Sequence, residues 1–266
     1  MYNLSGKTAI VTGGAGILGH WFCSGLAEFG AKIAVVDINE NNANRLSCAL
    51  QDRYRVKCMG IGCDVSSPKS VEMMLKKVTN AFGSIQILHN NAATKTQDLQ
   101  SYFHPLKKYT LQKWREVMAT NLDGMFLVAQ IVGQHMAERK NGSIIQTGSI
   151  YGIMAPDHRI YNGSYYNQRP ISTPAVYSAS KGGVVALTKY LATYWGKDGV
   201  RANTLTPGGV WSGQNQRFKK NYSARVPLGR MAIPSEMVGA LVFLASEASS
   251  YVTGQNIIID GGLNAW

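Results

Sequence analysis

Seven short apolar runs alternate along this chain with longer segments whose apolar residues recur at helical spacing. Most of the runs are apolar at nearly every position, which is the pattern of strands covered on both faces. Strand followed by helix, repeated, predicts a parallel sheet with right-handed crossovers and helices on both faces. The predicted strands span Thr8–Thr12, Lys32–Asp37, Lys57–Cys63, Ile85–Asn90, Ser143–Thr147, Arg201–Thr206 and Asn256–Asp260, and the predicted helices span Ile17–Phe29, Val71–Phe82, Leu111–Met136, Val176–Trp195 and Pro234–Ala245.

The predicted elements follow one another without an obvious linker. The chain has 266 residues and contains no Pro/Ser/Gly-rich linker, internal repeat or low-complexity tract. We therefore predict a single domain over residues 1–266. One long segment, at about residues 156–174, lacks both periodicities, and such a segment inside a compact α/β domain is usually functional or disordered.

The chain is basic, with 27 Lys and Arg against 15 Asp and Glu and a formal charge of +12. Its densest basic pieces are isolated pairs such as Lys76-Lys77, so a solvated basic surface is favoured over a nucleic-acid-binding one. No segment has the roughly 18 consecutive apolar residues of a membrane span, and no signal peptide is visible, which favours a cytoplasmic protein. The cysteines and histidines show no spacing typical of metal ligands, so no metal site is predicted.

A glycine-rich turn connects the first predicted strand to the first predicted helix, with the sequence Thr12-Gly13-Gly14-Ala15-Gly16-Ile17-Leu18-Gly19. Glycines let the backbone approach a pyrophosphate, whose charge then sits at the helix N-terminus among unpaired N–H groups. The context predicts dinucleotide binding and a Rossmann-type, doubly wound α/β fold with a seven-stranded parallel sheet. An ordinary tight turn is the alternative.

An acid, Asp37, ends the second predicted strand. A carboxylate there can accept hydrogen bonds from the ribose hydroxyls of NAD, whereas it would repel the 2′-phosphate of NADP. NAD is therefore the preferred cofactor, although a capping or turn role for Asp37 remains an alternative.

Tyr177 and Lys181 stand four residues apart at the start of a predicted helix, and this spacing places them on one helical face. A neighbouring ammonium favours the phenolate and lowers the pKa of a tyrosine from its usual value of about 10. The pair therefore predicts an acid/base tyrosine.

Together these motifs resemble those of the short-chain dehydrogenase/reductase family, and the resemblance covers essentially the whole chain. After the glycine-rich turn, the matching motifs are Cys63-Asp64-Val65, Asn90-Asn91-Ala92-Ala93, Asn121, Thr147-Gly148-Ser149, Tyr177 with Lys181, and Pro207-Gly208-Gly209.

The resemblance implies an oxidoreductase that transfers a hydride between nicotinamide and an alcohol or carbonyl carbon. It implies that Tyr177 exchanges the proton, Ser149 holds the substrate oxygen and Lys181 binds the nicotinamide ribose, while Asn121 supports a water-linked proton path. An alkoxide formed by hydride transfer needs both a proton and a fixed hydrogen-bond donor, so the chemistry agrees. The implied cofactor-binding residues are Gly13, Gly16, Ile17, Leu18, Gly19, Asp37, Asp64, Val65, Asn90, Ala92, Tyr177, Lys181, Pro207, Gly208, Val210 and Ser212.

Two positions depart from the family's usual pattern. The turn has the spacing Thr-Gly-x-x-Gly-x-x-Gly, which resembles the family's longer, sugar-nucleotide branch, whereas everything downstream matches the shorter, single-domain branch. After Pro207-Gly208 the family often has a threonine that contacts the nicotinamide carboxamide, and Ser212 retains the hydroxyl there.

The interval between Ser149 and Tyr177 is longer than is usual in the family, and the extra residues form the segment at about 156–174. Its ends are tied to two implied catalytic residues, so we predict that it contributes to substrate binding. An insertion that packs against a neighbouring subunit is a serious alternative. The predicted substrate-binding residues, including two from the segment after Pro207, are Arg159, Tyr161, Arg169, Trp211 and Gln214.

These amide, aromatic and cationic side chains favour a polar, polyhydroxylated and anionic substrate over a steroid or fatty acyl chain. We predict a sugar acid or a nucleotide sugar, which resembles the substrates of sugar-acid and polysaccharide-pathway members of the family. The rival function is a catalytically retired NAD-binding sensor or scaffold. The stretch from Pro234 to Gly262 resembles the part that packs between subunits in the family, which predicts a homo-oligomer, a tetramer or a dimer.

Overall fold

The computed structural model describes residues 1–96, 98–166 and 168–266, apart from the side chains of Tyr166 and Arg169. Its centre is a seven-stranded sheet in the order β3-β2-β1-β4-β5-β8-β9, in which every neighbouring pair is parallel. This confirms the predicted doubly wound sheet. The strands are β1 (Thr8–Thr12), β2 (Lys32–Asp37), β3 (Cys58–Gly62), β4 (Ile87–Asn90), β5 (Gly142–Thr147), β8 (Val200–Pro207) and β9 (Asn256–Ile259).

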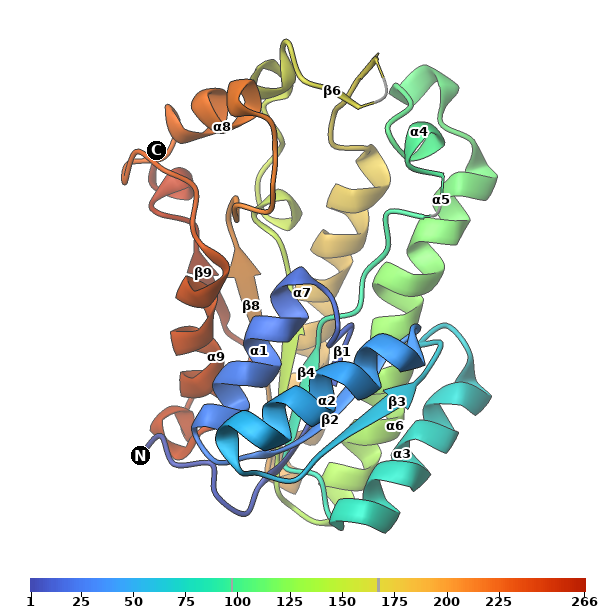
Figure 1. Ribbon diagram of the computed structural model, residues 1–266, viewed down its shortest axis with the longest axis vertical. Helices are drawn as coiled ribbons and strands as arrows, with labels where there is room; N and C mark the ends of the chain where they lie inside the picture. The colour runs from blue at the N-terminus through green and yellow to red at the C-terminus, as the bar shows by residue number, and fades with distance from the viewer. Residues whose placement is uncertain (97, 167) are drawn as a thin grey trace.

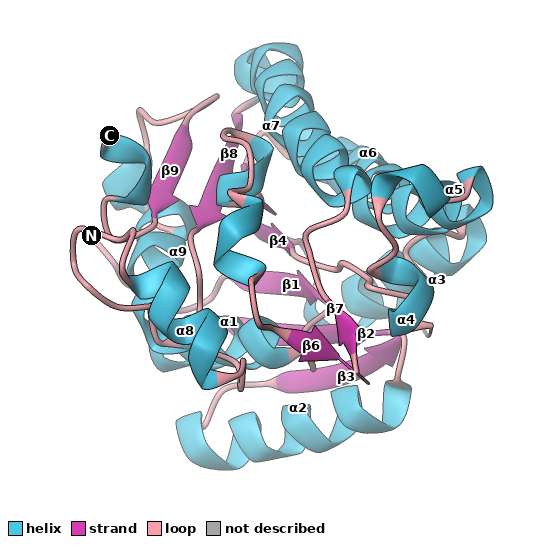
Figure 2. Cartoon of the chain, turned by 90° about the horizontal axis from the view of Figure 1, so that it is seen from above, coloured by secondary structure: helices cyan, strands magenta, loops and turns pink. Residues whose placement is uncertain are grey.

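Helices cover both faces of this sheet (Figures 1 and 2). Apolar residues of α1 (Ile17–Glu28), α2 (Glu40–Tyr54) and α9 (Val238–Ala245) form one core with the sheet, and those of α3 (Pro68–Phe82), α6 (Gly124–Glu138) and α7 (Ala175–Trp195) form the other. Successive side chains of a strand point to opposite faces, so neighbours such as Ile33 and Ala34 of β2 enter different cores. The nearly continuous apolar strands follow from this double burial.

The structure adds a helix that the apolar pattern did not predict, because α2 is polar except for one stripe. Its buried residues are Ala43, Leu46, Ser47 and Leu50, and the side chain of Asn39 caps its N-terminus by accepting from the Asn42 N–H. A single buried stripe is enough for a helix whose other sides face solvent.

The long helix predicted over Leu111–Met136 is divided. The structure has α5 (Leu111–Met118), then a π-helical turn over Ala119–Asp123, then α6. Single π-helical turns inside α-helices frequently occur at functional sites, and this one carries Asn121.

Above the carboxyl ends of the strands lies a cap of short elements. The insertion contributes a 3-10 helix over His158–Tyr161 and a hairpin of β6 (Tyr165–Tyr166) and β7 (Arg169–Pro170). The insertion packs against α8 (Gln216–Ser223), where the Asn221 amide donates to the Ile160 carbonyl at 3.1 Å. On the other side of the cap stands α4 (Leu99–Tyr102) (Figure 1).

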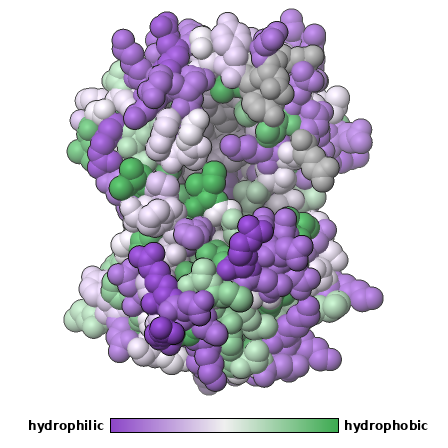
Figure 3. Space-filling view, viewed as in Figure 1, coloured by the Kyte–Doolittle hydropathy of each residue, from purple (hydrophilic) through white to green (hydrophobic). Residues whose placement is uncertain are grey.

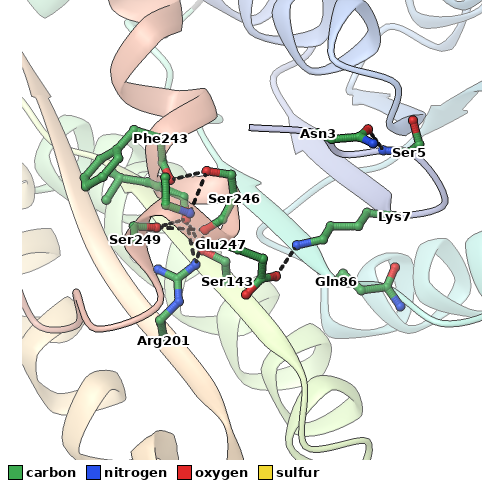
Figure 4. A network of polar contacts seen from close by, with 12 residues as sticks. Asn3, Ser5, Lys7, Gln86, Ser143, Arg201, Phe243, Ser246, Glu247 and Ser249 are labelled. Atoms are coloured by element: carbon green, nitrogen blue, oxygen red, sulfur yellow. Dashed lines mark hydrogen bonds and ion pairs between the residues drawn. The ribbon is translucent and has the colours of Figure 1, made fainter. Parts of the chain in front are cut away.

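At the amino ends of the strands, opposite the cap, a polar network joins β8 to the end of α9 (Figure 4). The Arg201 guanidinium donates to the carbonyls of Leu244, Ser246 and Val252, and Ser143 Oγ also donates to the Leu244 carbonyl, at 2.7 Å. These bonds satisfy backbone carbonyls at and after the end of α9, so we assign this network a structural role. Among the described residues, no helix is long and apolar enough to cross a membrane.

Candidate active site

The site begins where β1 and β4 lie side by side, because the order of the strands along the chain reverses there. In doubly wound sheets ligands bind at the carboxyl ends of the strands beside such a switch point. The Thr12 hydroxyl joins the two strand ends: it donates to Asn90 Oδ1 at 3.1 Å and accepts from the N–H groups of Asn91 and Ala92 at 2.9 and 3.1 Å. One side chain thus fixes the glycine-rich turn against the end of β4.

Three glycines of the turn, Gly13, Gly14 and Gly19, have no room for a side chain. Gly13 has φ +61°, and a Cβ on it would lie 2.9 Å from Ala92 Cα; a Cβ on Gly19 would lie 2.0 Å from the Gly13 carbonyl oxygen. These contacts let the turn pack directly against β4 and let α1 approach the turn. No side chain caps the N-terminus of α1 at Gly16, so its first N–H groups remain available to an anion such as a pyrophosphate.

Asp37 lies beside this turn at the end of β2 and is partly exposed. One carboxylate oxygen accepts from the Ala15 N–H at 3.1 Å and the other from the Asn39 N–H at 3.0 Å. The carboxylate is therefore held in place at the position expected for a ribose-binding acid.

A trough runs from the start of α1 to the start of α7. Its lining includes eight of the predicted cofactor-binding residues: Ile17, Leu18, Tyr177, Lys181, Pro207, Gly208, Val210 and Ser212. Asn91, Ala93 and Lys95 also line it and were not predicted. Sequence reasoning chose Asn90 and Ala92, but Asn90 is fully buried, with its amide donating to the Met125 carbonyl at 2.8 Å.

Asp64 and Val65, the predicted adenine-binding residues, follow β3. Val65 is 6% exposed, and Asp64 Oδ1 accepts from the Ser66 hydroxyl at 2.7 Å. Neither belongs to the lining of the trough, so their contact with adenine stays a prediction.

The implied catalytic residues meet at the inner end of the trough. Tyr177 lies in the first turn of α7, and its phenol and Ser149 line the same part of the trough. One turn further on, Lys181 is 2% exposed and its Nζ donates to the Thr147 carbonyl at 2.8 Å. The structure therefore brings Ser149, Tyr177 and Lys181 together.

Asn121 is fully buried in the π-helical turn. Its Oδ1 accepts from the Thr94 N–H at 2.8 Å, so it fixes the chain that follows β4. Its Nδ2 has no partner among the described residues. A buried amide donor with no partner is an expected place for an ordered water, which fits the predicted proton path.

The protonation behaviour differs from the expectation for Tyr177. Its pKa is raised, because burial of the phenol outweighs the hydrogen bond with Ser149. Burial lowers the pKa of Lys181 to about 8. The predicted lowering of the Tyr177 pKa is thus wrong for this structure: the ammonium is itself desolvated and bonded to a carbonyl.

A second cavity, of about 520 Å³, opens above the trough, and both cavities are lined by Ser149, Tyr177, Lys95 and Gly208. The face shown in Figure 3 is hollowed in this region, between the cap and the body of the fold. We call it the tyrosine-lined cavity, because its described lining includes Tyr102, Tyr151, Tyr161, Tyr165, Tyr177 and Tyr222.

The predicted substrate-binding residues divide into two groups. Tyr161 and Gln214 line the tyrosine-lined cavity. Arg159 does not, because its guanidinium projects to solvent and pairs with Asp157 at 2.9 Å. Trp211 also lies outside the lining, with the Lys219 ammonium 4.9 Å from its ring centroid. The Arg169 side chain falls outside the described part of the structure.

Behind the site, His89 is fully buried, and its Nε2 lies 2.8 Å from Thr147 Oγ1. Burial, together with the Lys181 charge, lowers the pKa of His89 to about 3. His89 is therefore a neutral core residue. Among the described residues, no group of three or more His, Cys, Asp or Glu is placed to hold a metal ion.

Comparison with known proteins agrees with this geometry. A profile of the family described as Enoyl-(Acyl carrier protein) reductase matches residues 15–264. D-threitol dehydrogenase from Mycolicibacterium smegmatis is 36% identical over 270 residues, covering 98% of this chain and 94% of the relative. The chain belongs to the short-chain dehydrogenase/reductase family. Like its family, it is an oxidoreductase that acts on CH–OH groups.

Two solved structures of this family are also similar. Gluconate 5-dehydrogenase from Burkholderia cenocepacia, in complex with NADP and tartrate, is 33% identical with a TM-score of 0.87, covering 100% of this chain and 98% of that one. NAD+-bound xylitol dehydrogenase is 27% identical with a TM-score of 0.85, covering 97% of this chain and 99% of that one. The short-chain dehydrogenase/reductase fold described above is thus one that holds a nicotinamide dinucleotide.

Proposed function

We propose that this short-chain dehydrogenase/reductase interconverts a hydroxyl and a carbonyl group on a polyol-like, sugar-derived substrate, with NAD as its preferred cofactor. The observation that carries the proposal is the junction of the trough and the tyrosine-lined cavity at Ser149 and Tyr177. A cofactor in the trough and a substrate in the tyrosine-lined cavity would therefore meet beside the Ser149 hydroxyl and the Tyr177 phenol. The intact set of these residues with Asn121 and Lys181 favours an enzyme over a retired scaffold.

The residues of the trough fit a dinucleotide. The uncapped start of α1 suits the pyrophosphate, and Lys181 and Ser212 lie where the nicotinamide half would be held. A bound nicotinamide supplies or accepts the hydride at the substrate carbon. The protein supplies the rest: Ser149 Oγ positions the substrate oxygen, and Tyr177 exchanges its proton.

The raised pKa of Tyr177 has a consequence for direction. A raised pKa favours the protonated phenol at neutral pH, and this form is ready to donate to a forming alkoxide, as reduction requires. Oxidation requires the proton of Tyr177 to leave first.

NAD preference rests on Asp37. Its carboxylate is fixed by two backbone N–H groups, and the next residues, Ile38 and Asn39, bring no cation that could neutralise a 2′-phosphate. A fixed carboxylate can bind the ribose hydroxyls and repels a phosphate at the same place. The similar structures contain either NAD or NADP, so the preference is proposed from this chain's own residues.

The substrate class rests on the walls of the tyrosine-lined cavity. Hydroxyl and amide groups of Ser172, Thr173, Gln214 and Asn215 accompany the tyrosines there. Such groups hydrogen-bond polyols, and aromatic rings pack against the C–H faces of sugars. The similar proteins named above are dehydrogenases of threitol, gluconate and xylitol, which supports a polyol or a sugar acid. A nucleotide sugar remains the other sugar-derived candidate.

The proposal is tested by measuring the turnover of a panel of sugar-derived compounds. Purified enzyme is mixed with NAD or NADP and with threitol, xylitol, glucitol, gluconate or a nucleotide sugar, and NADH formation is followed by absorbance. We expect NAD-dependent oxidation of at least one panel member. Absence of turnover with every sugar-derived compound, in both directions, would contradict the proposed substrate class.

We further propose that the chain acts as one domain within a homo-oligomer, a tetramer or a dimer, in the cytoplasm. A role in polysaccharide synthesis is the corresponding proposal for a nucleotide-sugar substrate. Light scattering on the purified enzyme tests the oligomer.

A further inference from the structure

Lys95 occupies the junction of the two cavities. It follows the end of β4 and lines both the trough and the tyrosine-lined cavity, as do Ser149 and Tyr177. Its side chain is exposed, and no ion pair or hydrogen bond engages its ammonium among the described residues. An unpaired cation therefore stands beside the reacting groups.

The backbone that carries Lys95 is held on both sides. Before it, the Thr94 N–H donates to Asn121 Oδ1 at 2.8 Å; after it, the Thr96 N–H donates to Thr94 Oγ1, also at 2.8 Å. Thr96 has φ +65°, in the left-handed region that a β-branched residue rarely adopts. Surrounding contacts maintain such strain mainly at functional sites, and here it sets the direction of the chain next to Lys95.

The charge balance of the tyrosine-lined cavity points the same way. Lys95 is the only cation among its described lining residues, and these residues include no Asp or Glu. In the trough, the only other cation among the described lining residues is Lys181, which is bonded to the Thr147 carbonyl. The cavity thus carries a positive charge, next to Ser149 and Tyr177, that no carboxylate of the described residues neutralises.

We propose that Lys95 binds an anionic group of the substrate, a carboxylate or a phosphate, and thereby makes the enzyme select acidic over neutral polyols. This rests on the proposed function and extends it. The sequence pattern assigned that role to Arg159 and Arg169; the structure directs Arg159 to Asp157 instead and places Lys95 at the site.

The experiment compares three substrates that share one carbon chain: neutral glucitol, gluconate, and glucitol 6-phosphate. Steady-state kinetics with saturating NAD are measured for the wild type, Lys95→Met, Lys95→Arg and Arg169→Met. Lys107→Met is the matched control, because Lys107 is exposed and lines neither cavity. The two acidic substrates separate a carboxylate site from a phosphate site.

Loss of one charge-assisted contact typically lowers affinity about ten- to a hundredfold. We therefore expect Lys95→Met to lower kcat/KM by that factor for at least one acidic substrate and by less than about twofold for glucitol. Lys95→Arg should restore most of the loss, and Lys107→Met should behave as the wild type. An equal effect on acidic and neutral substrates, or a loss seen only with Arg169→Met, would overturn the proposal.

A binding measurement keeps the inference separate from the proposed function. Titration calorimetry with gluconate or glucitol 6-phosphate is performed on the enzyme with NADH, which cannot react with an alcohol. We expect weaker binding of one acid in Lys95→Met and unchanged binding of NADH. If nothing on the panel is turned over but this difference remains, the proposed reaction fails and the anion site stands. If instead NADH binding alone weakens, Lys95 belongs to the cofactor and the inference is wrong.

Discussion

Replacing the buried Lys181 by methionine should abolish activity and yet stabilise the protein near pH 7. Lys181 is 2% exposed, its single hydrogen bond goes to the Thr147 carbonyl at 2.8 Å, and burial lowers its pKa from 10.5 to about 8. A lowered lysine pKa means that the folded state disfavours the charged form. Methionine has a similar length and carries no charge, so it removes this cost.

The magnitude follows from the pKa difference. Each pKa unit corresponds to about 1.4 kcal/mol, so the charged Lys181 costs the folded state about 3 kcal/mol at pH 7. Methionine leaves the Thr147 carbonyl without its donor, which costs about 1 kcal/mol. We therefore expect Lys181→Met to raise the free energy of unfolding by about 2 kcal/mol at pH 7.

The sign of the pH dependence is fixed by proton binding. Between pH 8 and 10.5 the unfolded chain holds the Lys181 proton more strongly than the folded chain does, so wild-type stability rises with pH over this window. The advantage of the variant should therefore shrink by about 2 kcal/mol between pH 7 and about 9.5.

The assay is equilibrium urea unfolding followed by tryptophan fluorescence at the two pH values and one protein concentration. Lys189→Met, an exposed lysine of the same helix, is the matched control and should show neither the stabilisation nor the pH dependence. A Lys181→Met variant that is less stable than the wild type by the same amount at both pH values would refute this reasoning.

Three further predictions concern the core and the cofactor site. Asp37→Ala should lower kcat/KM for NAD and raise it for NADP, and equal values for both cofactors in the wild type would contradict the role of Asp37. The pKa of His89 is lowered from 6.5 to about 3, so between these pH values the unfolded chain binds a proton that the folded chain does not, and the free energy of unfolding of the wild type should decrease as the pH is lowered below 6.5. His89→Phe should lose less of its free energy of unfolding over the same pH range, and the same loss in both proteins would count against this cause. Gly19→Ala puts a Cβ 2.0 Å from a backbone oxygen and should cost about 1–3 kcal/mol or more in thermal unfolding, whereas Gly239→Ala, with open space around it in α9, should be neutral or stabilising.

The sheet was predictable because its strands are buried on both faces and are therefore apolar throughout. The helix α2 was not predictable from the apolar pattern, since only one stripe of it is buried and its polar residues outnumber its apolar ones. The π-helical turn at Asn121 was also invisible, because it preserves the helical run of apolar residues and changes only the backbone hydrogen bonds.

At the site, motif spacing located Ser149, Tyr177 and Lys181, since residues at strand ends and on one helical face are brought together by the fold itself. Motif spacing predicted that Asn90 lines the cofactor trough. Side chains alternate at the end of β4, so Asn90 is buried and Asn91 lines the trough instead. Residue type alone could not show which cation, Arg159 or Lys95, faces the substrate cavity, because the pairing of Arg159 with Asp157 depends on the local turn. The pKa of Tyr177 likewise depended on burial, which the sequence does not display.

The most direct test of the account is hydride transfer by the wild type and by Tyr177→Phe, measured as NADH formation from the sugar-derived panel. Phenylalanine keeps the ring and loses the proton, so kcat should fall at least about a hundredfold while the dissociation constant for NADH changes by less than about twofold. Near wild-type kcat in Tyr177→Phe would contradict the assignment of the proton to this phenol.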